Sequence, residues 1–129
     1  MTRLFVYGTL MPGQARWPVL EPFTDLRMTN RTATVSGRLW DTGWGWPAMT
    51  AGERTVPGVV VALVPASTEE AIARLDEIEG VASGLFTREV IDTSVEPACT
   101  AYLWPGATDG FTELHGGWER RCMSSVARP

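Results

Sequence analysis

The chain has 129 residues, of which 44% are hydrophobic and 20% are charged, as expected for one globular domain with one buried core. Its formal net charge of −4 argues against a broad basic face, so we expect no nucleic-acid partner. All 11 basic residues are arginines, which excludes Schiff-base and Ser–Lys chemistry. We therefore predict a single domain over residues 1–129.

Short strand patterns separated by turn residues dominate the chain. In chain order we predict a strand over 4–7, a loop through 8–13, a short helix over 16–20, a strand over 31–40, a Gly- and Trp-rich loop over 41–47, a strand over 56–64 buried on both faces, a helix over 68–79, strands over 85–95 and 99–104 joined by a turn, and a short helix or loop over 111–118. Strands outnumber helices, and short turns join several of them. We predict an α+β fold, a small mixed, mostly antiparallel, partly closed β-barrel with one main helix and short helices packed around it.

The helix over 68–79 has the clearest boundaries. Ser67 is a natural N-cap, and Glu70 three residues later completes the pattern of a capping box. Gly80 is well placed as the residue that ends the helix, because glycine readily takes the left-handed conformation needed there.

One carboxylate of this helix is predicted to point inward. At about 100° per residue, Ile72, Leu75 and Glu79 share one stripe, whereas Glu77 points away from it. Burial and the negative end of the helix dipole both raise the pKa of such a carboxyl group toward a range useful for proton transfer. The alternative is that Glu79 bends out to water or pairs with an arginine, for which Arg88 is a candidate.

The turn after the first strand is the second candidate feature. It consists of Tyr7, Gly8, Thr9 and Leu10, and Gly8 has no Cβ, so its backbone can approach a ligand or take a positive φ. Successive free N–H groups in such a turn can hold an anion such as a carboxylate. A simple turn after a strand is the alternative.

Metal and redox chemistry have little support in the composition. The single histidine, His115, cannot build a multi-histidine metal site, and Cys99 and Cys122 have no metal-like spacing. The N-terminus has no signal-like apolar region, and the run over 59–64 is too short to span a membrane. We expect a cytoplasmic protein with no metal, no cofactor and no membrane partner.

Several segments together resemble the γ-glutamylcyclotransferase-like (AIG2-like) family. They are Val6-Tyr7-Gly8-Thr9-Leu10, Gly37-Arg38-Leu39-Trp40-Asp41, Trp46-Pro47-Ala48, Leu75-Asp76-Glu77-Ile78-Glu79-Gly80, Phe86-Thr87-Arg88 and Gly117-Trp118. The resemblance runs from about Leu4 to Trp118, and the order and spacing of the segments are more specific than any one of them. The γ-glutamylamine cyclotransferase type is the most similar branch.

The resemblance implies that Glu79 is the catalytic acid/base and that the turn from Tyr7 to Leu10 binds the α-carboxylate of a γ-glutamyl group. Trp46, Phe86 and Arg88 are further candidate substrate-binding residues. The implied reaction is intramolecular aminolysis, giving 5-oxoproline and a free amine or amino acid without a metal or cofactor. This sequence departs from the family by having Trp40, Trp46 and Phe86 where tyrosine is common, which leaves the substrate open.

Two other functions fit the same residues. One is a non-catalytic module that binds a small γ-glutamyl metabolite, although a module of that kind commonly loses the carboxylate that this chain keeps at Glu79. The other is a γ-glutamyl hydrolase, which would release glutamate in place of 5-oxoproline. The expected partner in each case is a small molecule, and the chain is expected to be a monomer or a homodimer.

Overall fold

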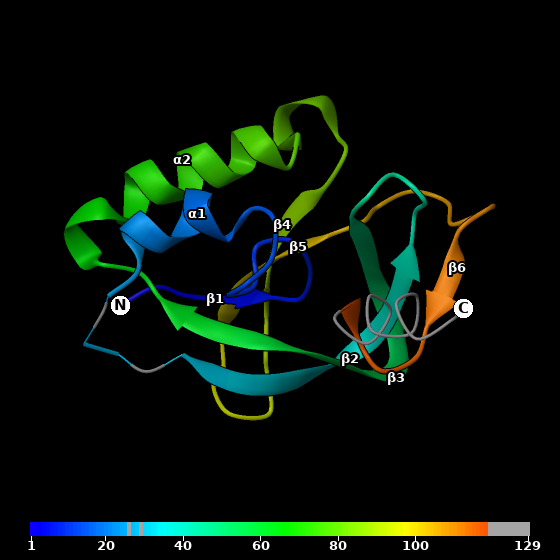
Figure 1. The fold of residues 1–129 in the computed structure, drawn as a ribbon, viewed down its shortest axis with the longest axis horizontal. Helices are drawn as coiled ribbons and strands as arrows, with labels where there is room; N and C mark the ends of the chain where they lie inside the picture. The colour runs from blue at the N-terminus through cyan, green and yellow to red at the C-terminus, as the bar shows by residue number, and fades with distance from the viewer. Residues whose placement is uncertain (26, 29, 119–129) are drawn as a thin grey trace.

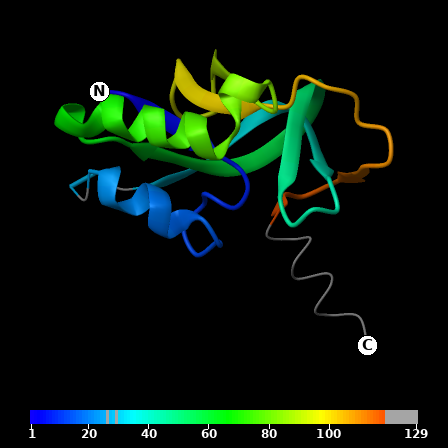
Figure 2. The same cartoon turned by 90° about the horizontal axis from the view of Figure 1, so that it is seen from above.

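A computed structural model describes residues 1–25, 27–28 and 30–118. Its elements in chain order are β1 (Arg3–Val6), α1 (Trp17–Leu20), η1 (Glu21–Phe23), β2 (Arg31–Asp41), β3 (Pro47–Ala62), η2 (Pro65–Ser67), α2 (Thr68–Ile78), η3 (Val81–Ser83), β4 (Thr87–Ile91), β5 (Cys99–Leu103) and β6 (Thr112–Leu114), where η marks a 3-10 turn. Both helices lie over one half of the molecule, and the far ends of β2 and β3 form the other half with β6 (Figures 1 and 2).

The six strands form one sheet in the order β4-β5-β1-β3-β2-β6. Only the pair of β1 and β5 is parallel among the described strands, so the mixed, mostly antiparallel sheet is confirmed. Strand β1 is short, and beyond its end the neighbouring strands β5 and β3 approach each other. There the amide of Trp104, directly after β5, donates a hydrogen bond to the carbonyl of Met49 in β3 at 2.8 Å. This contact curls the sheet into the partly closed arrangement, while the edge strands β4 and β6 do not pair with each other.

A break in the pairing of β2 and β3 adds to the curvature. The register shifts between Gly37 and Arg38, whose partners are Arg54 and Thr50, so three residues of β3 stay outside the ladder. Such a bulge bends a strand and increases its twist. A Cβ at Gly37 would lie 2.9 Å from the carbonyl oxygen of Thr50, which explains glycine at this point.

Helix α2 packs through a narrow apolar stripe. Ala71 and Leu75 are fully buried and Ile72 is partly buried against the core. The predicted end of the helix is confirmed, since Gly80 follows it with φ 65°. The predicted capping box is wrong, because the side chain of Ser67 makes no cap hydrogen bond. The helix begins directly from the 3-10 turn η2, and Ser67 has φ −109° and ψ 3°, outside the extended region that a capping serine usually takes.

Three predicted segments need correction. Strand β3 begins at Pro47, well before the apolar run at 56–64, because its first half pairs with β2 in a hairpin that does not need apolar residues on both faces. Strand β4 ends at Ile91, since 92–98 forms a turn. In this turn the amide and the hydroxyl of Thr93 both donate hydrogen bonds to the carbonyl of Glu96. Within 111–118, residues Thr112–Leu114 form strand β6 on the edge of β2, where a helix or loop was predicted.

Candidate active site

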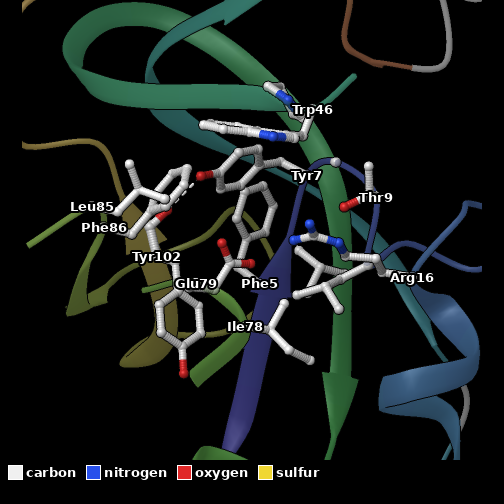
Figure 3. A pocket seen from close by; sticks show the side chains of 14 residues that line it. Phe5, Tyr7, Thr9, Arg16, Trp46, Ile78, Glu79, Leu85, Phe86 and Tyr102 are labelled. Carbon is white, nitrogen blue, oxygen red and sulfur yellow. Dashed lines mark hydrogen bonds between the residues drawn. The ribbon is translucent and has the colours of Figure 1, made fainter. Parts of the chain in front are cut away.

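A pocket opens where β1 ends and β3 and β5 converge. It is lined by Phe5, Val6, Tyr7, Gly8, Thr9, Leu10, Arg16, Trp46, Pro47, Ile78, Glu79, Leu85, Phe86 and Tyr102. Figure 3 shows Thr9 and Arg16 on one side, Leu85 and Phe86 on the opposite side, and the carboxylate of Glu79 between them. The structure therefore brings together the two features that the sequence placed about 70 residues apart, the turn after the first strand and the end of the main helix.

The turn at residues 8–11 has amides available to a ligand. The amide of Met11 donates to the carbonyl of Gly8 at 3.0 Å, which makes Thr9 and Leu10 the central residues of a β-turn. The N–H groups of these two central residues form no hydrogen bond with any other residue that the structure describes. Free amides at a turn beside a pocket can bind an anion.

Gly8 is required for packing against Pro47. A Cβ on Gly8 would lie 2.5 Å from Cγ and 2.7 Å from Cδ of Pro47, far inside van der Waals contact. Gly8 is absent from the described glycines with positive φ, so the alternative explanation from the sequence, a left-handed turn residue, does not apply. The missing Cβ lets the turn lie flat against the start of β3.

Glu79 is the partly buried acid of the pocket. It is the C-cap residue of α2, its amide donates to the carbonyl of Leu75 at 2.8 Å, and the left-handed Gly80 then turns the chain away. Burial raises the pKa of the Glu79 carboxyl group to about 7, against an opposing effect of the positive charge of Arg16. A group with a pKa near neutrality can accept a proton and return it.

Arg16 is the positive charge of the pocket. Its amide donates to the carbonyl of Thr9 at 2.7 Å, which ties the start of α1 to the β-turn. Its guanidinium points toward Glu79 across the pocket (Figure 3), but no ion pair within 4.0 Å joins the two side chains. Arg16 was not predicted from the sequence, because a residue in a loop has no periodic pattern that shows which way its side chain points.

Tyr7 is buried at the back of the pocket. Its phenol donates a hydrogen bond to the carbonyl of Tyr102 in β5. Burial and the nearby carboxylate of Glu79 raise the pKa of the Tyr7 phenol well above its ordinary value. Tyr7 therefore stays protonated near neutral pH and links the end of β1 to β5.

Arg88 lies outside the lining of the pocket. Its guanidinium forms an ion pair with Asp76, and the hydroxyl of Tyr102 donates to the other oxygen of Asp76 at 2.8 Å. The pair that the sequence suggested between Arg88 and Glu79 is not formed. Thr87–Ile91 runs along the outer edge of the sheet, and this position directs Arg88 to the outer flank of α2.

Trp46 and Phe86 contribute the aromatic part of the pocket wall. Trp46 contacts Phe86 at a centroid distance of 5.6 Å, and both rings contact Trp104, at 6.1 Å and 5.5 Å. Trp44 packs on Trp46 at 5.3 Å, yet 61% of Trp44 is exposed. Of the predicted binding residues, Trp46 and Phe86 thus line the pocket, and an exposed aromatic surface continues from its rim.

Six further lining residues besides Arg16 were not predicted from the sequence. They are Phe5, Val6, Pro47, Ile78, Leu85 and Tyr102. All of them except Phe5 and Tyr102 directly adjoin a predicted site residue, and Phe5 lies two residues before Tyr7. Only the position of Tyr102 depends entirely on how distant strands meet.

The described residues contain no group of three or more His, Cys, Asp or Glu side chains that could hold a metal ion. Cys99 is free and buried, whereas Cys122 lies outside the described residues. No helix in the described part of the chain is long and apolar enough to cross a membrane.

Fold and pocket together define a small α+β protein with one acidic group and one guanidinium in a largely apolar site. Comparison with known families then identifies the family. Residues 4–120 match the family model of gamma-glutamyl cyclotransferase, AIG2-like, and the chain belongs to this family.

One curated relative is the gamma-L-glutamyl-butirosin B gamma-glutamyl cyclotransferase of Niallia circulans, 33% identical over 92 residues. The match covers 71% of this chain and 54% of the relative, so the chain spans about half the length of that protein.

Solved structures share the fold. An uncharacterized protein from Pyrococcus horikoshii matches with a TM-score of 0.73 and 19% identity over 100% of both chains. YkqA from Bacillus subtilis matches with a TM-score of 0.74 and 22% identity, over 98% of this chain and 43% of YkqA. The protein ytfP from Escherichia coli matches with a TM-score of 0.62 and 23% identity, over 94% of this chain and 99% of ytfP.

Proposed function

We propose that this protein is a γ-glutamyl cyclotransferase that converts a γ-glutamyl amine or γ-glutamyl amino acid to 5-oxoproline and the free amine or amino acid. The observation that carries the proposal is the position of Glu79, a partly buried carboxyl group with a pKa of about 7 facing a turn with free amides. Membership of the cyclotransferase family supports the same reaction.

The chemistry needs few protein groups, because the substrate supplies its own nucleophile. The α-amine attacks the γ-carbonyl carbon, a C–N bond closes the five-membered ring, and the original C–N bond to the leaving amine breaks. Glu79 takes a proton from the attacking amine and gives a proton to the leaving nitrogen. The pocket must also hold the substrate in a folded conformation, since bringing the amine within reach of the carbonyl removes much of the barrier.

The amides of Thr9 and Leu10 bind the α-carboxylate in this proposal. The apolar rings of Trp46 and Phe86 surround the part of the substrate that leaves. The described site offers Glu79 as the proton carrier, and the mechanism assigns no step to a metal or cofactor.

The test is release of 5-oxoproline from a panel of γ-glutamyl amines and γ-glutamyl amino acids. We expect release by the wild type and a loss of at least about 100-fold in Glu79→Gln, as general acid–base catalysis contributes roughly 100- to 10,000-fold. The matched control is Glu77→Gln, because Glu77 is an exposed acid on the same helix and should not affect turnover.

Three results would count against the proposal. Equal activity of wild type and Glu79→Gln would remove Glu79 from the mechanism. Release of glutamate in place of 5-oxoproline would show hydrolysis. Binding of the panel without turnover by the wild type would show a binding module.

A further inference from the structure

Arg16 is the one partly buried arginine among the described residues that forms no ion pair within 4.0 Å, and its charge acts on Glu79 only from a longer distance. Six other arginines each pair with an acidic side chain: Arg3, Arg27, Arg31, Arg38, Arg54 and Arg88. Arg74 has no such pair either, but it is exposed on α2. A charge held partly out of water is costly unless something compensates it. The guanidinium of Arg16 is therefore available to bind an anionic group of a ligand.

The backbone places Arg16 beside the β-turn. Its amide is bonded to the carbonyl of Thr9 at 2.7 Å, and both side chains lie on the same side of the pocket (Figure 3). The free amides of Thr9 and Leu10 and the Arg16 guanidinium thus border one region. Guanidinium groups bind carboxylates in a two-pronged geometry, and backbone amides can complete such a site.

We propose that Arg16 binds the α-carboxylate of the γ-glutamyl substrate and so sets the direction in which the substrate lies in the pocket. This inference rests on the proposed function, which by itself assigns the carboxylate only to the turn amides. The specificity it adds is for substrates whose glutamyl end keeps a free carboxylate.

The rest of the pocket supports this direction. The opposite side is formed by Leu85 and Phe86, where a carboxylate would lose its hydration without a compensating charge. Glu79 lies between the two sides, and an ionised Glu79 repels a second carboxylate unless a cation lies close by. With the carboxylate at Arg16, the γ-carbonyl lies toward Glu79 and the leaving amine extends toward the aromatic rings.

A binding experiment tests the contact independently of turnover. The two ligands are 5-oxoproline, which carries a carboxylate, and 5-oxoprolinamide, in which a neutral amide replaces it. Each is titrated by calorimetry into the wild type and into three variants, Arg16→Gln, Arg16→Lys and Arg74→Gln. The wild type and Arg74→Gln should bind the acid about 30-fold more tightly than the amide, the range expected for a charged hydrogen bond. In Arg16→Gln the preference should fall to within about 3-fold, and Arg16→Lys should keep part of it. Arg16→Gln keeps the amide bonded to Thr9, and an unchanged melting temperature would show that the turn is intact.

Turnover separates the two possible sources of a carboxylate. Arg16→Gln should lose about 30-fold in kcat/KM on γ-glutamyl amines, whose only carboxylate is the α-carboxylate. A loss confined to γ-glutamyl amino acids would overturn the proposal and assign Arg16 to the leaving amino acid. An unchanged preference for the acid in Arg16→Gln, or no preference in the wild type, would also overturn it.

The two proposals can fail separately. An Arg16-dependent preference for the acid without any release of 5-oxoproline by the wild type would reject the cyclotransferase and retain the carboxylate site. Normal release by a folded Arg16→Gln variant would reject the role of Arg16 and retain the cyclotransferase.

Discussion

Replacing Glu79 with glutamine should make the protein more stable at alkaline pH while it abolishes turnover. Burial raises the pKa of Glu79 from 4.5 to about 7 in the folded protein. Each pKa unit corresponds to roughly 1.4 kcal/mol, so ionising Glu79 reduces the free energy of unfolding by about 2–3 kcal/mol once partial solvent screening is included. Glutamine has a similar shape and no charge, so Glu79→Gln avoids this loss.

The direction of the pH dependence follows from the raised pKa. The folded state holds the proton of Glu79 more tightly than the unfolded state does. Its contribution to stability is therefore complete below pH 4.5, and it is lost as the pH rises through about 7. The wild type and Glu79→Gln should have similar stability at pH 4.5, and the variant should be about 2 kcal/mol more stable at pH 8.

Denaturant unfolding of wild type, Glu79→Gln and Glu77→Gln at both pH values measures this difference. Other titrating groups affect the three proteins alike and cancel in the comparison. Glu77→Gln should follow the wild type, because Glu77 is exposed. The reasoning is refuted if the difference between wild type and Glu79→Gln does not change with pH, or if Glu77→Gln shows the same change.

The remaining predictions concern the turn, the back of the pocket and its outer flank. Gly8→Ala should reduce the free energy of unfolding by about 1–3 kcal/mol, and adding Pro47→Ala should restore part of it, because that change removes the ring atoms that the new Cβ would meet; no recovery in the double variant would contradict the packing argument. Tyr7→Phe should lower the free energy of unfolding by about 1–3 kcal/mol, because the carbonyl of Tyr102 loses the phenol that donates to it. Denaturant unfolding measures this change. A loss below about 0.5 kcal/mol, the range of a neutral surface substitution, would show that this hydrogen bond does not stabilise the fold. Arg88→Ala should change the free energy of unfolding by less than about 1 kcal/mol, because its ion pair with Asp76 is exposed. It should also leave kcat/KM within a few-fold of the wild type. A large rise in KM would show that Arg88 contributes to substrate binding.

Local patterns predicted the elements that carry the candidate acid. The 3.6-residue period directs Glu79 and Leu75 to one side of α2, and a glycine after the last turn ends the helix there. The period does not depend on which surface the helix covers. The turn after β1 could also be located from its local sequence. The packing of Gly8 against Pro47 could not, because it depends on a distant strand.

Longer-range packing decided the elements that the patterns missed. The first half of β3 and the short strand β6 are strands because they add to β2. Pairing with a neighbour supplies their backbone hydrogen bonds, so they do not need strong alternation of apolar residues. Ser67 looked like a cap, but the 3-10 turn before α2 changes its backbone geometry.

The sequence by itself predicted that Glu79, at the end of the main helix, points inward and that an amide-bearing turn follows the first strand. Only the tertiary structure decided which arginine lies with them. Arg16 enters the pocket because its amide bonds the turn, while Arg88 pairs with Asp76 on the outer flank. Periodicity specifies directions within one element, whereas the neighbours of a loop or edge-strand side chain depend on how distant segments pack.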